Sequence, residues 1–172
     1  MMAIGFMTLL RASARFNQGL GLRPWQSLMV ATVLAGMIGA VFPDAMGLGT
    51  QVVAQIFHGS WMAEGLFVLV LAKLLVTALC LGFGFFGGVF SPALLVGAAS
   101  GAILGQAMVA LGMTVPGPAM ALAGMAAVAA AVVGAPLATV VIVLELTASY
   151  EFALLALVAV VVSMVVSSLF FG

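Results

Sequence analysis

The sequence predicts an all-α membrane protein with broken and re-entrant helices. Of its 172 residues, 66% are hydrophobic and only 5% are charged. A soluble domain of this size needs a charged exterior, which four Lys/Arg and four Asp/Glu cannot provide. In lipid every backbone N–H and C=O needs a partner, so only helices or closed barrels span. Within each apolar stretch, polar and apolar residues do not alternate as they do in barrel strands, so helices are favoured. Gly and Pro separate one stretch from the next, which favours broken helices.

The first elements are an apolar segment and a polar stretch. Residues 1–10 are apolar, and Arg11, Arg15 and Arg23 follow. Because the charge follows the apolar run instead of preceding it, a secretory signal is not favoured. We expect the end of a membrane helix and then a loop from Arg11 to Arg23, on the cytoplasmic side, where short loops are rich in Lys and Arg. Pro24 fits the first turn of the next helix, over residues 25–42.

The middle of the chain alternates between short and long apolar segments. After a glycine-rich stretch at residues 47–49, residues 52–57 are too short to span a membrane. A longer helix is expected over residues 62–81, and residues 82–88, Gly-Phe-Gly-Phe-Phe-Gly-Gly, interrupt it. The next helix follows Pro92 and ends near residue 111. His58 lies close to Trp61, so an interfacial loop residue is favoured over a proton carrier.

The C-terminal elements are again broken by proline and glycine. A turn at residues 116–118 precedes an apolar stretch over 119–133, and residues 134–136 separate it from a short segment. The last helix, residues 152–171, is about twenty residues long and can span a membrane unaided. Broken helices at membrane depth are tolerated where protein covers them or where they line a cavity. They are typical of transport pathways.

The most informative interruption is the sequence Gly88, Val89, Phe90, Ser91, Pro92. Glycine permits a sharp turn and the close approach of another group, Pro92 fits a first helical turn, and Ser91 can cap it. A helix that begins there inside the membrane leaves the N–H groups of Val89, Phe90 and Ser91 free. These donors and the positive end of the helix dipole form an anion site that binds moderately, so that the ion can leave. On spacing alone, a re-entrant turn without a ligand fits equally well.

Two charged residues lie deep within apolar runs. Placing such groups in a membrane costs about 2.5–3.5 kcal/mol or more, so each is a functional hypothesis by default. For Lys73, an electrostatic role in an anion pathway and a structural partner, either a helix-end carbonyl or a carboxylate elsewhere in the chain, both remain open. For Glu145, near a helix end, a buried structural hydrogen bond is favoured over proton transfer.

Three glycines follow the interruption at four-residue spacing, Gly97, Gly101 and Gly105. This spacing places them on one face of a helix. A glycine face lets a neighbouring helix backbone come very near. We therefore interpret the stripe as a packing surface.

The sequence does not favour an enzyme, and we predict no catalytic residue, metal or cofactor. Cys80 is the only cysteine, so it can form no internal disulfide and is interpreted as a packing residue. His58 is the only histidine, and neither G-x-S-x-G nor H-E-x-x-H occurs. The zero net charge also argues against a nucleic-acid partner.

Three motifs in order resemble one family. Gly88 to Pro92 resembles the G-x-F-x-P anion-filter motif of the CLC chloride channels and chloride/proton antiporters. Residues 123–127, Ala-Gly-Met-Ala-Ala, resemble the family's A-G-M-A/G-A segment. Residues 135–139 and 143–147, Ala-Pro-Leu-Ala-Thr and Val-Leu-Glu-Leu-Thr, are similar to its A-P-L-T/A and V-L-E-M/L-T stretches. The resemblance covers nearly the whole chain, most clearly from Leu66 to Gly172.

The resemblance implies a fold and partners. CLC subunits are inverted repeats of two membrane halves, and two subunits form a dimer with one pore each. Residues 1–172 resemble most of the second half, a partial transmembrane domain without the first repeat and the last helix. Chloride is then expected to face the amides of Val89 and Phe90, with Ser91. The segments from Leu137 to Leu146 and from Phe152 to Phe171 are expected at a homodimer interface.

Departures from the family pattern limit what the resemblance implies. The serine loop G-S-G-I-P and the gate loop G-R-E-G-P are absent. Phe90 matches the gate glutamate in the inverted repeat and cannot carry a proton, and Tyr150 does not match the pore tyrosine. We therefore expect chloride transport across the lipid bilayer as part of a channel or antiporter, incomplete without the missing first half. The alternative is a non-transporting membrane scaffold that retains only the packing of the fold.

Overall fold

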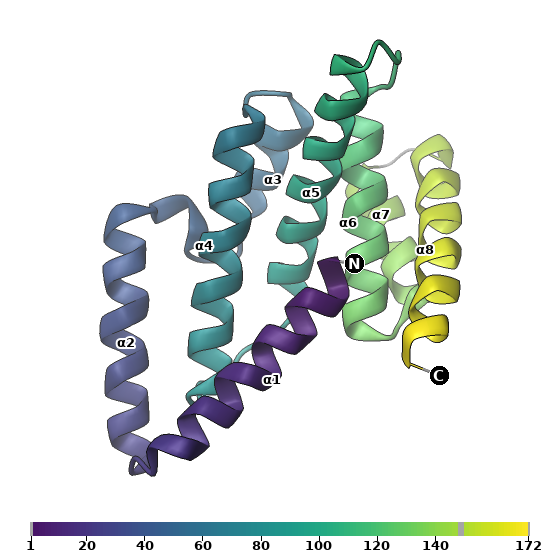
Figure 1. Ribbon diagram of the computed structural model, residues 1–172. Coiled ribbons are helices and arrows are strands. Elements are labelled where there is room, and N and C mark those ends of the chain that lie inside the picture. The colour runs from purple at the N-terminus through teal and green to yellow at the C-terminus, as the bar shows by residue number, and fades with distance from the viewer. Residues whose placement is uncertain (1, 148–149, 172) are drawn as a thin grey trace.

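The computed structural model describes residues 2–147 and 150–171, and within them every regular element is a helix. The elements are α1 (Met2–Leu20), α2 (Pro24–Val41), the 3-10 turn η1 (Pro43–Ala45), α3 (Thr50–Phe57), α4 (Ala63–Gly82), α5 (Phe90–Ala110), α6 (Gly117–Val133), α7 (Pro136–Thr147) and α8 (Tyr150–Phe171) (Figure 1). Four of the described helices, α2, α4, α5 and α8, are long and apolar enough to cross a membrane. The all-α membrane prediction is confirmed.

The long helices run side by side along one axis of the molecule, with α5 and α6 at its centre (Figure 1). Helix α4 packs on one side of this pair and α8 on the other, while α3 lies against both α5 and α6. Helix α1 crosses obliquely against α4, and α2 stands at the edge (Figure 1). The start of α5 is therefore close to the middle of the fold.

The N-terminal helix is longer than expected. It runs without a break to Leu20, so Arg11 and Arg15 lie on α1, and only Arg23 lies in the connection to α2. The prediction of a loop from Arg11 to Arg23 was wrong. Ala, Arg and Gln in this stretch are good helix formers, and the first left-handed residue is Gly21, with φ 60°. Pro24 occupies the first turn of α2, as expected.

The contact between α5 and α6 is made by backbone. A Cβ added to Gly97 would lie 2.5 Å from the carbonyl oxygen of Gly124, and one on Gly101 would overlap the carbonyl of Met120. A Cβ on Gly124 would likewise overlap the carbonyl of Gly97. The glycine stripe is therefore the packing surface that its spacing predicts, and it fixes α5 in place from Gly97 onward.

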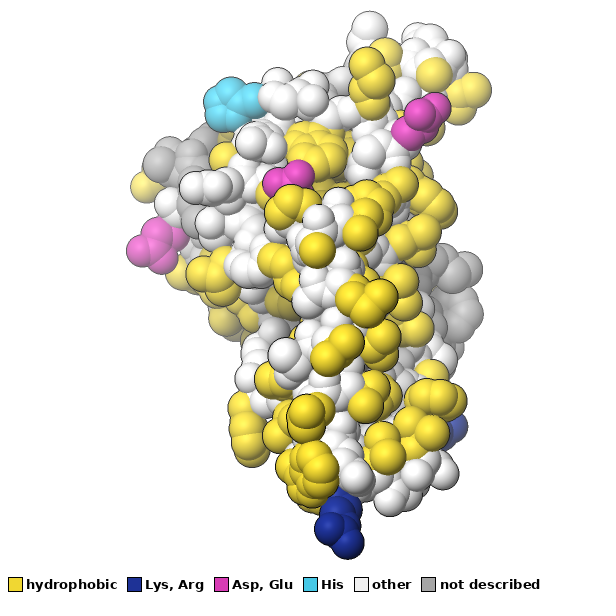
Figure 2. All heavy atoms as spheres, turned by 90° about the vertical axis from the view of Figure 1, so that its left-hand side faces the viewer, with side chains coloured by type: hydrophobic (Ala, Val, Ile, Leu, Met, Phe, Trp, Pro, Cys, Tyr) yellow, Lys and Arg dark blue, Asp and Glu magenta, His cyan; other side chains and the backbone are white. Residues whose placement is uncertain are grey.

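The outer surfaces of the long helices are apolar. Figure 2 shows hydrophobic side chains along the face made by α2 and α4. On α8, Leu154, Val158 and Leu169 are more than half exposed. Such surfaces suit a lipid environment.

Candidate functional site

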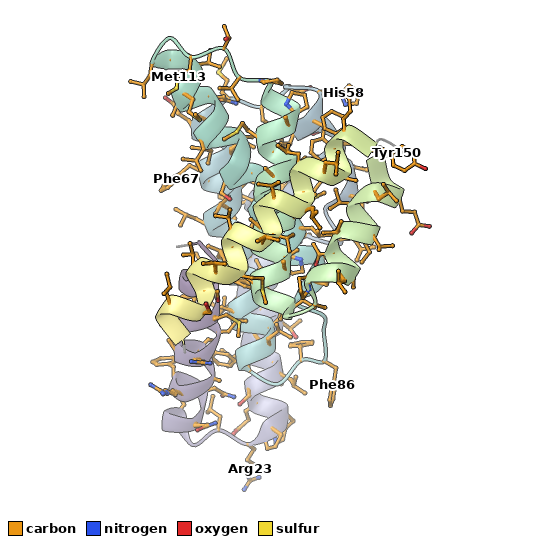
Figure 3. All side chains as sticks on the ribbon, turned by 90° about the vertical axis from the view of Figure 1, so that its right-hand side faces the viewer. Arg23, His58, Phe67, Phe86, Met113 and Tyr150 are labelled. Carbon is orange, nitrogen blue, oxygen red and sulfur yellow. The ribbon has the colours of Figure 1, made fainter. Side chains whose placement is uncertain are left out.

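The interruption between α4 and α5 places a partly buried helix start part of the way along the molecule. Helix α4 ends at Gly82, and the N–H of Phe85 donates to the carbonyl of Cys80 at 2.9 Å. Residues 84–88 are exposed, and Phe86 points outward from the fold (Figure 3). The first turn of α5 lies part of the way along the molecule, above the lower end of α4 (Figure 1). The chain thus turns back beside α4 before the new helix begins.

Three consecutive N–H groups at this helix start have no acceptor. Among the described residues, no hydrogen bond pairs the N–H of Val89, Phe90 or Ser91. The first bond of the turn runs from the N–H of Ala93 to the carbonyl of Val89, at 3.1 Å, and Pro92 has no N–H. Unpaired donors of this kind favour a negative ligand, because the helix dipole is positive at the same end. The anion-binding role of these residues remains a prediction.

Ser91 does not cap the helix. Helix α5 begins at Phe90, two residues before Pro92, and its N-cap is Val89, with no side-chain cap bond. The Ser91 hydroxyl instead donates to the carbonyl of Leu48 in the turn between η1 and α3. The cap prediction was wrong because a proline at the third helical position costs the helix no hydrogen bond. The helix can therefore start earlier.

Lys73 has structural partners at the same turn. Its side chain is 4% exposed, and its ammonium donates to the carbonyl oxygens of Ala45 at 3.0 Å and Gly47 at 2.6 Å. Of the two roles left open by the sequence, the structural one has its partners here: both are backbone carbonyls, one at the end of η1 and one in the turn that follows it. A cavity of about 270 Å³ lies between Lys73 on one side and Gly88 and Pro92 on the other, and all three residues line it.

Sequence reasoning missed the importance of the turn formed by residues 45–49. Its carbonyls at Ala45, Gly47 and Leu48 accept the hydrogen bonds from Lys73 and Ser91. Two signals pointed to it: the Gly-Leu-Gly sequence, which predicts backbone without regular hydrogen bonds, and a buried lysine, which requires acceptors.

Glu145 lies outside the core. The expected buried hydrogen bond is not found, and the side chain is exposed. Helix α7 presents Thr139 and Val143 to the rest of the fold, since both are buried. Glu145 follows Val143 by two residues, about 200° around the helix, and so faces away. The His58 ring lies at the end of α3, exposed, with Nδ1 2.7 Å from the carbonyl oxygen of Ala54, which agrees with a loop residue.

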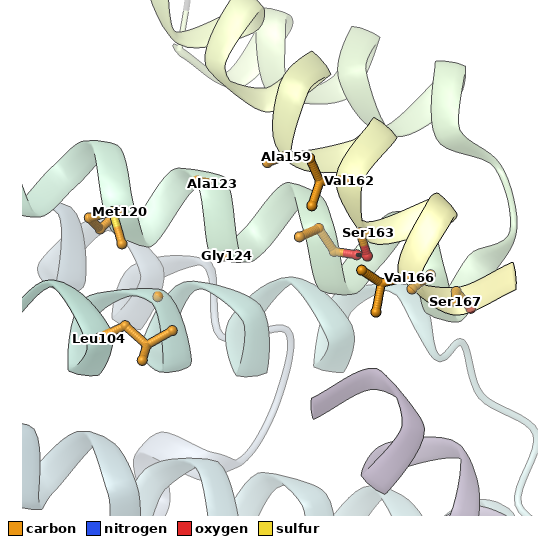
Figure 4. A pocket seen from close by; sticks show the side chains of 12 residues that line it. Leu104, Met120, Ala123, Gly124, Ala159, Val162, Ser163, Val166 and Ser167 are labelled. Atoms are coloured by element: carbon orange, nitrogen blue, oxygen red, sulfur yellow. Dashed lines mark hydrogen bonds between the residues drawn. The ribbon is translucent and has the colours of Figure 1, made fainter. Parts of the chain in front are cut away.

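A groove between α5, α6 and α8 is apolar. It measures about 420 Å³ and is lined mostly by small or aliphatic side chains, including Leu104, Ala159 and Val166 (Figure 4). Two serines of α8 line it, Ser163 and Ser167, and the Ser163 hydroxyl donates to the carbonyl of Ala127 at 2.7 Å. Because no charged side chain of the described residues lines the groove and Ser163 already joins α8 to α6, it offers no chemistry comparable to the start of α5.

The chain is similar to curated chloride transport proteins. It is 34% identical over 132 residues to a putative chloride channel protein ClcB-like from Ralstonia nicotianae, covering 74% of this chain and 30% of that protein. It is 30% identical over 150 residues to the H(+)/Cl(-) exchange transporter ClcA of Vibrio campbellii, covering 84% and 32%. It is 37% identical over 133 residues to the chloride channel protein CLC-f of Arabidopsis thaliana, covering 70% and 17%.

The match to a family is broader than the match to any of these relatives. Residues 1–168 match the family described as voltage gated chloride channel. The sequence Gly88 to Pro92 before and at the start of α5 lies inside the matched region, and so does the glycine stripe of α5. The helical fold, the apolar surfaces and this match agree, and the chain belongs to the voltage-gated chloride channel (CLC) family.

Proposed function

We propose that this chain forms part of a chloride pathway in a CLC-type channel or chloride/proton exchanger. The anion is bound by the backbone N–H groups of Val89, Phe90 and Ser91. The observation that carries the proposal is the set of unpaired N–H groups at the partly buried start of α5. The family match and the chloride transport named for the relatives support it.

The proposed site binds without a full positive charge. The Ser91 hydroxyl is committed as a donor to Leu48, so Ser91 contributes its amide. A Cβ added to Gly88 would meet no atom within 4 Å, which leaves open space for an ion beside the amides. Amides and a helix dipole hold an anion less tightly than a paired cation does, and conduction requires such release.

The chain spans between 17% and 32% of the length of the three relatives named above. We propose that a first repeat supplies the opposite face of the pathway and the gate. The polypeptide of residues 1–172 alone is then expected to release no chloride from liposomes. Selective chloride efflux from this polypeptide alone would contradict the half-pathway proposal.

The amides can be tested by removing one donor. Replacing the amide between Val89 and Phe90 by an ester deletes the N–H of Phe90 and keeps the ring, whereas Phe90→Ala removes the ring but keeps the N–H. Proline is unsuitable at this position, because Val89 has the right-handed α conformation that a following proline disfavours. Equilibrium binding of radioactive chloride to the reconstituted protein is the measurement. We expect the ester variant to bind about tenfold more weakly than Phe90→Ala, since hydrogen bonds to charged groups contribute about 1.5–3 kcal/mol.

The rival proposal is a membrane scaffold that keeps the packing of the fold and binds no ion. The tightly packed α5–α6 pair is compatible with it. It predicts no difference in chloride binding between the ester variant at Phe90 and Phe90→Ala. In a complete pore, it also predicts unchanged anion flux when Phe90 or Ser91 is replaced.

We further propose that the end of the molecule carrying the arginines is cytoplasmic. Arg23 lies at the opposite end of the fold from His58 and Met113 (Figure 3). An excess of Arg and Lys marks cytoplasmic segments. In a Cys80→Ala background, Gln18→Cys should react with a membrane-impermeant maleimide only from the cytoplasmic face of oriented vesicles.

A homodimer through α7 and α8 is also proposed. The supporting observation is an uncovered apolar surface on both helices, including Leu137, Val141 and Leu154. A single cysteine introduced at Leu137, or one at Val141, should cross-link to the same residue of a second chain in the membrane. Failure of both variants, with cross-linking from an α2 position such as Val33 instead, would place the interface elsewhere.

A further inference from the structure

The turn of residues 45–49 is tied to two helices at once. The ammonium of Lys73, from α4, donates hydrogen bonds to two carbonyls of the turn, those of Ala45 and Gly47. The hydroxyl of Ser91, from α5, donates to a third, that of Leu48. We propose that Lys73 is a positioning residue: it fixes this turn, and through the turn and Ser91 it sets the orientation of the first turn of α5. The effect of Lys73 on chloride binding rests on the function proposed above.

The first step is the position of Lys73 itself. It lies in the middle of α4, a helix long and apolar enough to span a membrane, and is 4% exposed. A charge in such a place must be compensated by hydrogen bonds. The compensation comes from two carbonyls of one short turn, at 2.6 and 3.0 Å. Lysine and turn therefore constrain each other.

The second step is the backbone of the turn. Gly47 and Gly49 have φ of 65° and 72°, so the chain here is left-handed at two nearby positions and cannot form a regular helix. The carbonyls are thereby directed out of the segment toward side-chain donors. Gly49 is also covered by Leu95 of α5, since a Cβ at Gly49 would overlap the leucine methyl. The turn is thus held against α5 at two points.

The third step is the connection to the helix start. Ser91 is the second residue of α5 and one of the three unpaired N–H donors. Its hydroxyl has the turn's Leu48 carbonyl as its acceptor. If the turn moves because Lys73 no longer holds it, the acceptor of Ser91 moves with it. The amides of the first turn then lose one of the contacts that align them.

A direct effect of the lysine charge on the anion is the competing explanation. Such an effect does not depend on Ser91, because it acts through space, and salt screens it little because Lys73 is buried. An effect through the turn depends on Ser91, because that hydroxyl is the link. The two explanations therefore differ in the coupling between positions 73 and 91.

The first experiment measures the turn without any ion. Residue-resolved amide hydrogen exchange of the reconstituted chain follows Met46 in the turn, Val53 just after it, and Ala93 in the first turn of α5; all three N–H groups are hydrogen-bonded. Lys73→Met is expected to accelerate their exchange about tenfold, the effect of one lost hydrogen bond to a charged group, and Lys73→Arg to restore it. Unchanged exchange in Lys73→Met overturns the proposal.

Thr77→Val is the matched control. Thr77 lies one turn further along α4, is buried, and lines the same cavity, but its hydroxyl donates to the carbonyl of Lys73 in its own helix. It should leave the exchange of the turn unchanged. If Lys73→Met does not fold, Ser91→Ala cuts the other tie: faster exchange at Val53 and Ala93 supports the proposal, and unchanged exchange overturns it.

The second experiment is a double-mutant cycle on chloride affinity. We expect about a tenfold loss for Lys73→Met, a loss at least as large for Ser91→Ala, and no further loss when Lys73→Met is added to Ser91→Ala. Additive losses from the two substitutions would overturn the proposal in favour of a direct charge effect. A wild-type chain that binds no chloride would refute the proposed function, whereas the exchange experiment would still decide the role of Lys73.

Discussion

Two glycine-rich regions of this molecule use the same residue for opposite purposes. In the α5–α6 seam, defined by Gly97, Gly101 and Gly124, the space of each missing side chain is filled by the backbone of the facing helix. In the interruption before α5, a Cβ at Gly84 or Gly88 would meet no atom within 4 Å. Glycine in the seam makes two helices touch, whereas glycine in the interruption leaves the backbone accessible.

The two regions use glycine differently because one packs two helices together and the other exposes backbone amides. Helices in lipid associate through van der Waals contact, so a seam gains from removing side chains that hold two backbones apart. Glycine beside a helix start leaves space for a ligand to approach the free amides. The comparison therefore predicts that an added methyl group destabilises the seam but leaves the interruption folded.

The largest effect is expected for Gly101→Ala. The added Cβ would overlap the carbonyl of Met120 and lie 3.1 Å from the Cα of Ala121, and backbone atoms cannot move aside without separating the helices. We expect a loss of about 3 kcal/mol in the free energy of unfolding, at the upper end for overpacked cores. Unfolding followed by circular dichroism in detergent measures it.

Gly105→Ala is the matched control on the same stripe. There the nearest atom is the Cβ of the Met120 side chain, at 3.1 Å. A small adjustment of α6 or of this side chain can accommodate the methyl group, and alanine favours the helix. We expect a change below about 1 kcal/mol. Equal losses at both positions would show that the seam is not held by backbone contact.

An intermediate effect is expected for Gly84→Ala in the interruption. No atom obstructs the new Cβ, but φ is 99°, which L-residues other than glycine rarely adopt. The expected cost is about 1–2 kcal/mol, from backbone strain alone. Gly87→Ala, whose φ is not left-handed and whose nearest atom is a flexible Leu81 methyl at 3.4 Å, should cost less in the same unfolding measurement. If Gly87→Ala proves the costlier change, steric contact and not φ governs this segment.

A smaller effect is expected for Ser163→Ala, which removes the 2.7 Å hydrogen bond from α8 to the Ala127 carbonyl on α6. Hydrogen bonds between membrane helices contribute about 0.6 kcal/mol on average. Thermal unfolding should therefore shift less than in Gly101→Ala. A larger shift than Gly101→Ala would mean that polar contacts, and not glycine packing, hold α6 in the core.

The sequence predicted most helices because apolar length and Gly or Pro interruptions determine them locally. It failed where a side chain had two possible uses. Arg11 and Arg15 were read as loop residues from their charge, although arginine also favours helices. Ser91 was read as a cap, although its hydroxyl reaches Leu48, 43 residues away in the chain. Glu145 was placed inside, although its helical phase relative to Val143 points it outward.

The smallest effect on stability, and the most informative one, is expected for Gly88→Ala. The new methyl group would meet no atom, and the residue does not require a left-handed φ, so unfolding should change by less than about 0.5 kcal/mol. Gly36→Ala, at an equally open position on α2, is the matched control: it should stabilise the helix by up to about 1 kcal/mol and leave chloride binding unchanged.

Chloride binding should separate these two variants. If the anion approaches the amides of Val89 and Phe90 through the open space at Gly88, the methyl group occupies that space. We then expect about a tenfold loss of affinity, comparable to losing one hydrogen bond to a charged partner, while Gly36→Ala binds as the wild type does. Wild-type affinity in Gly88→Ala would mean that the open backbone of the interruption is not the route to the amides. The contrast between a closed glycine seam and an accessible helix start would then hold for packing only.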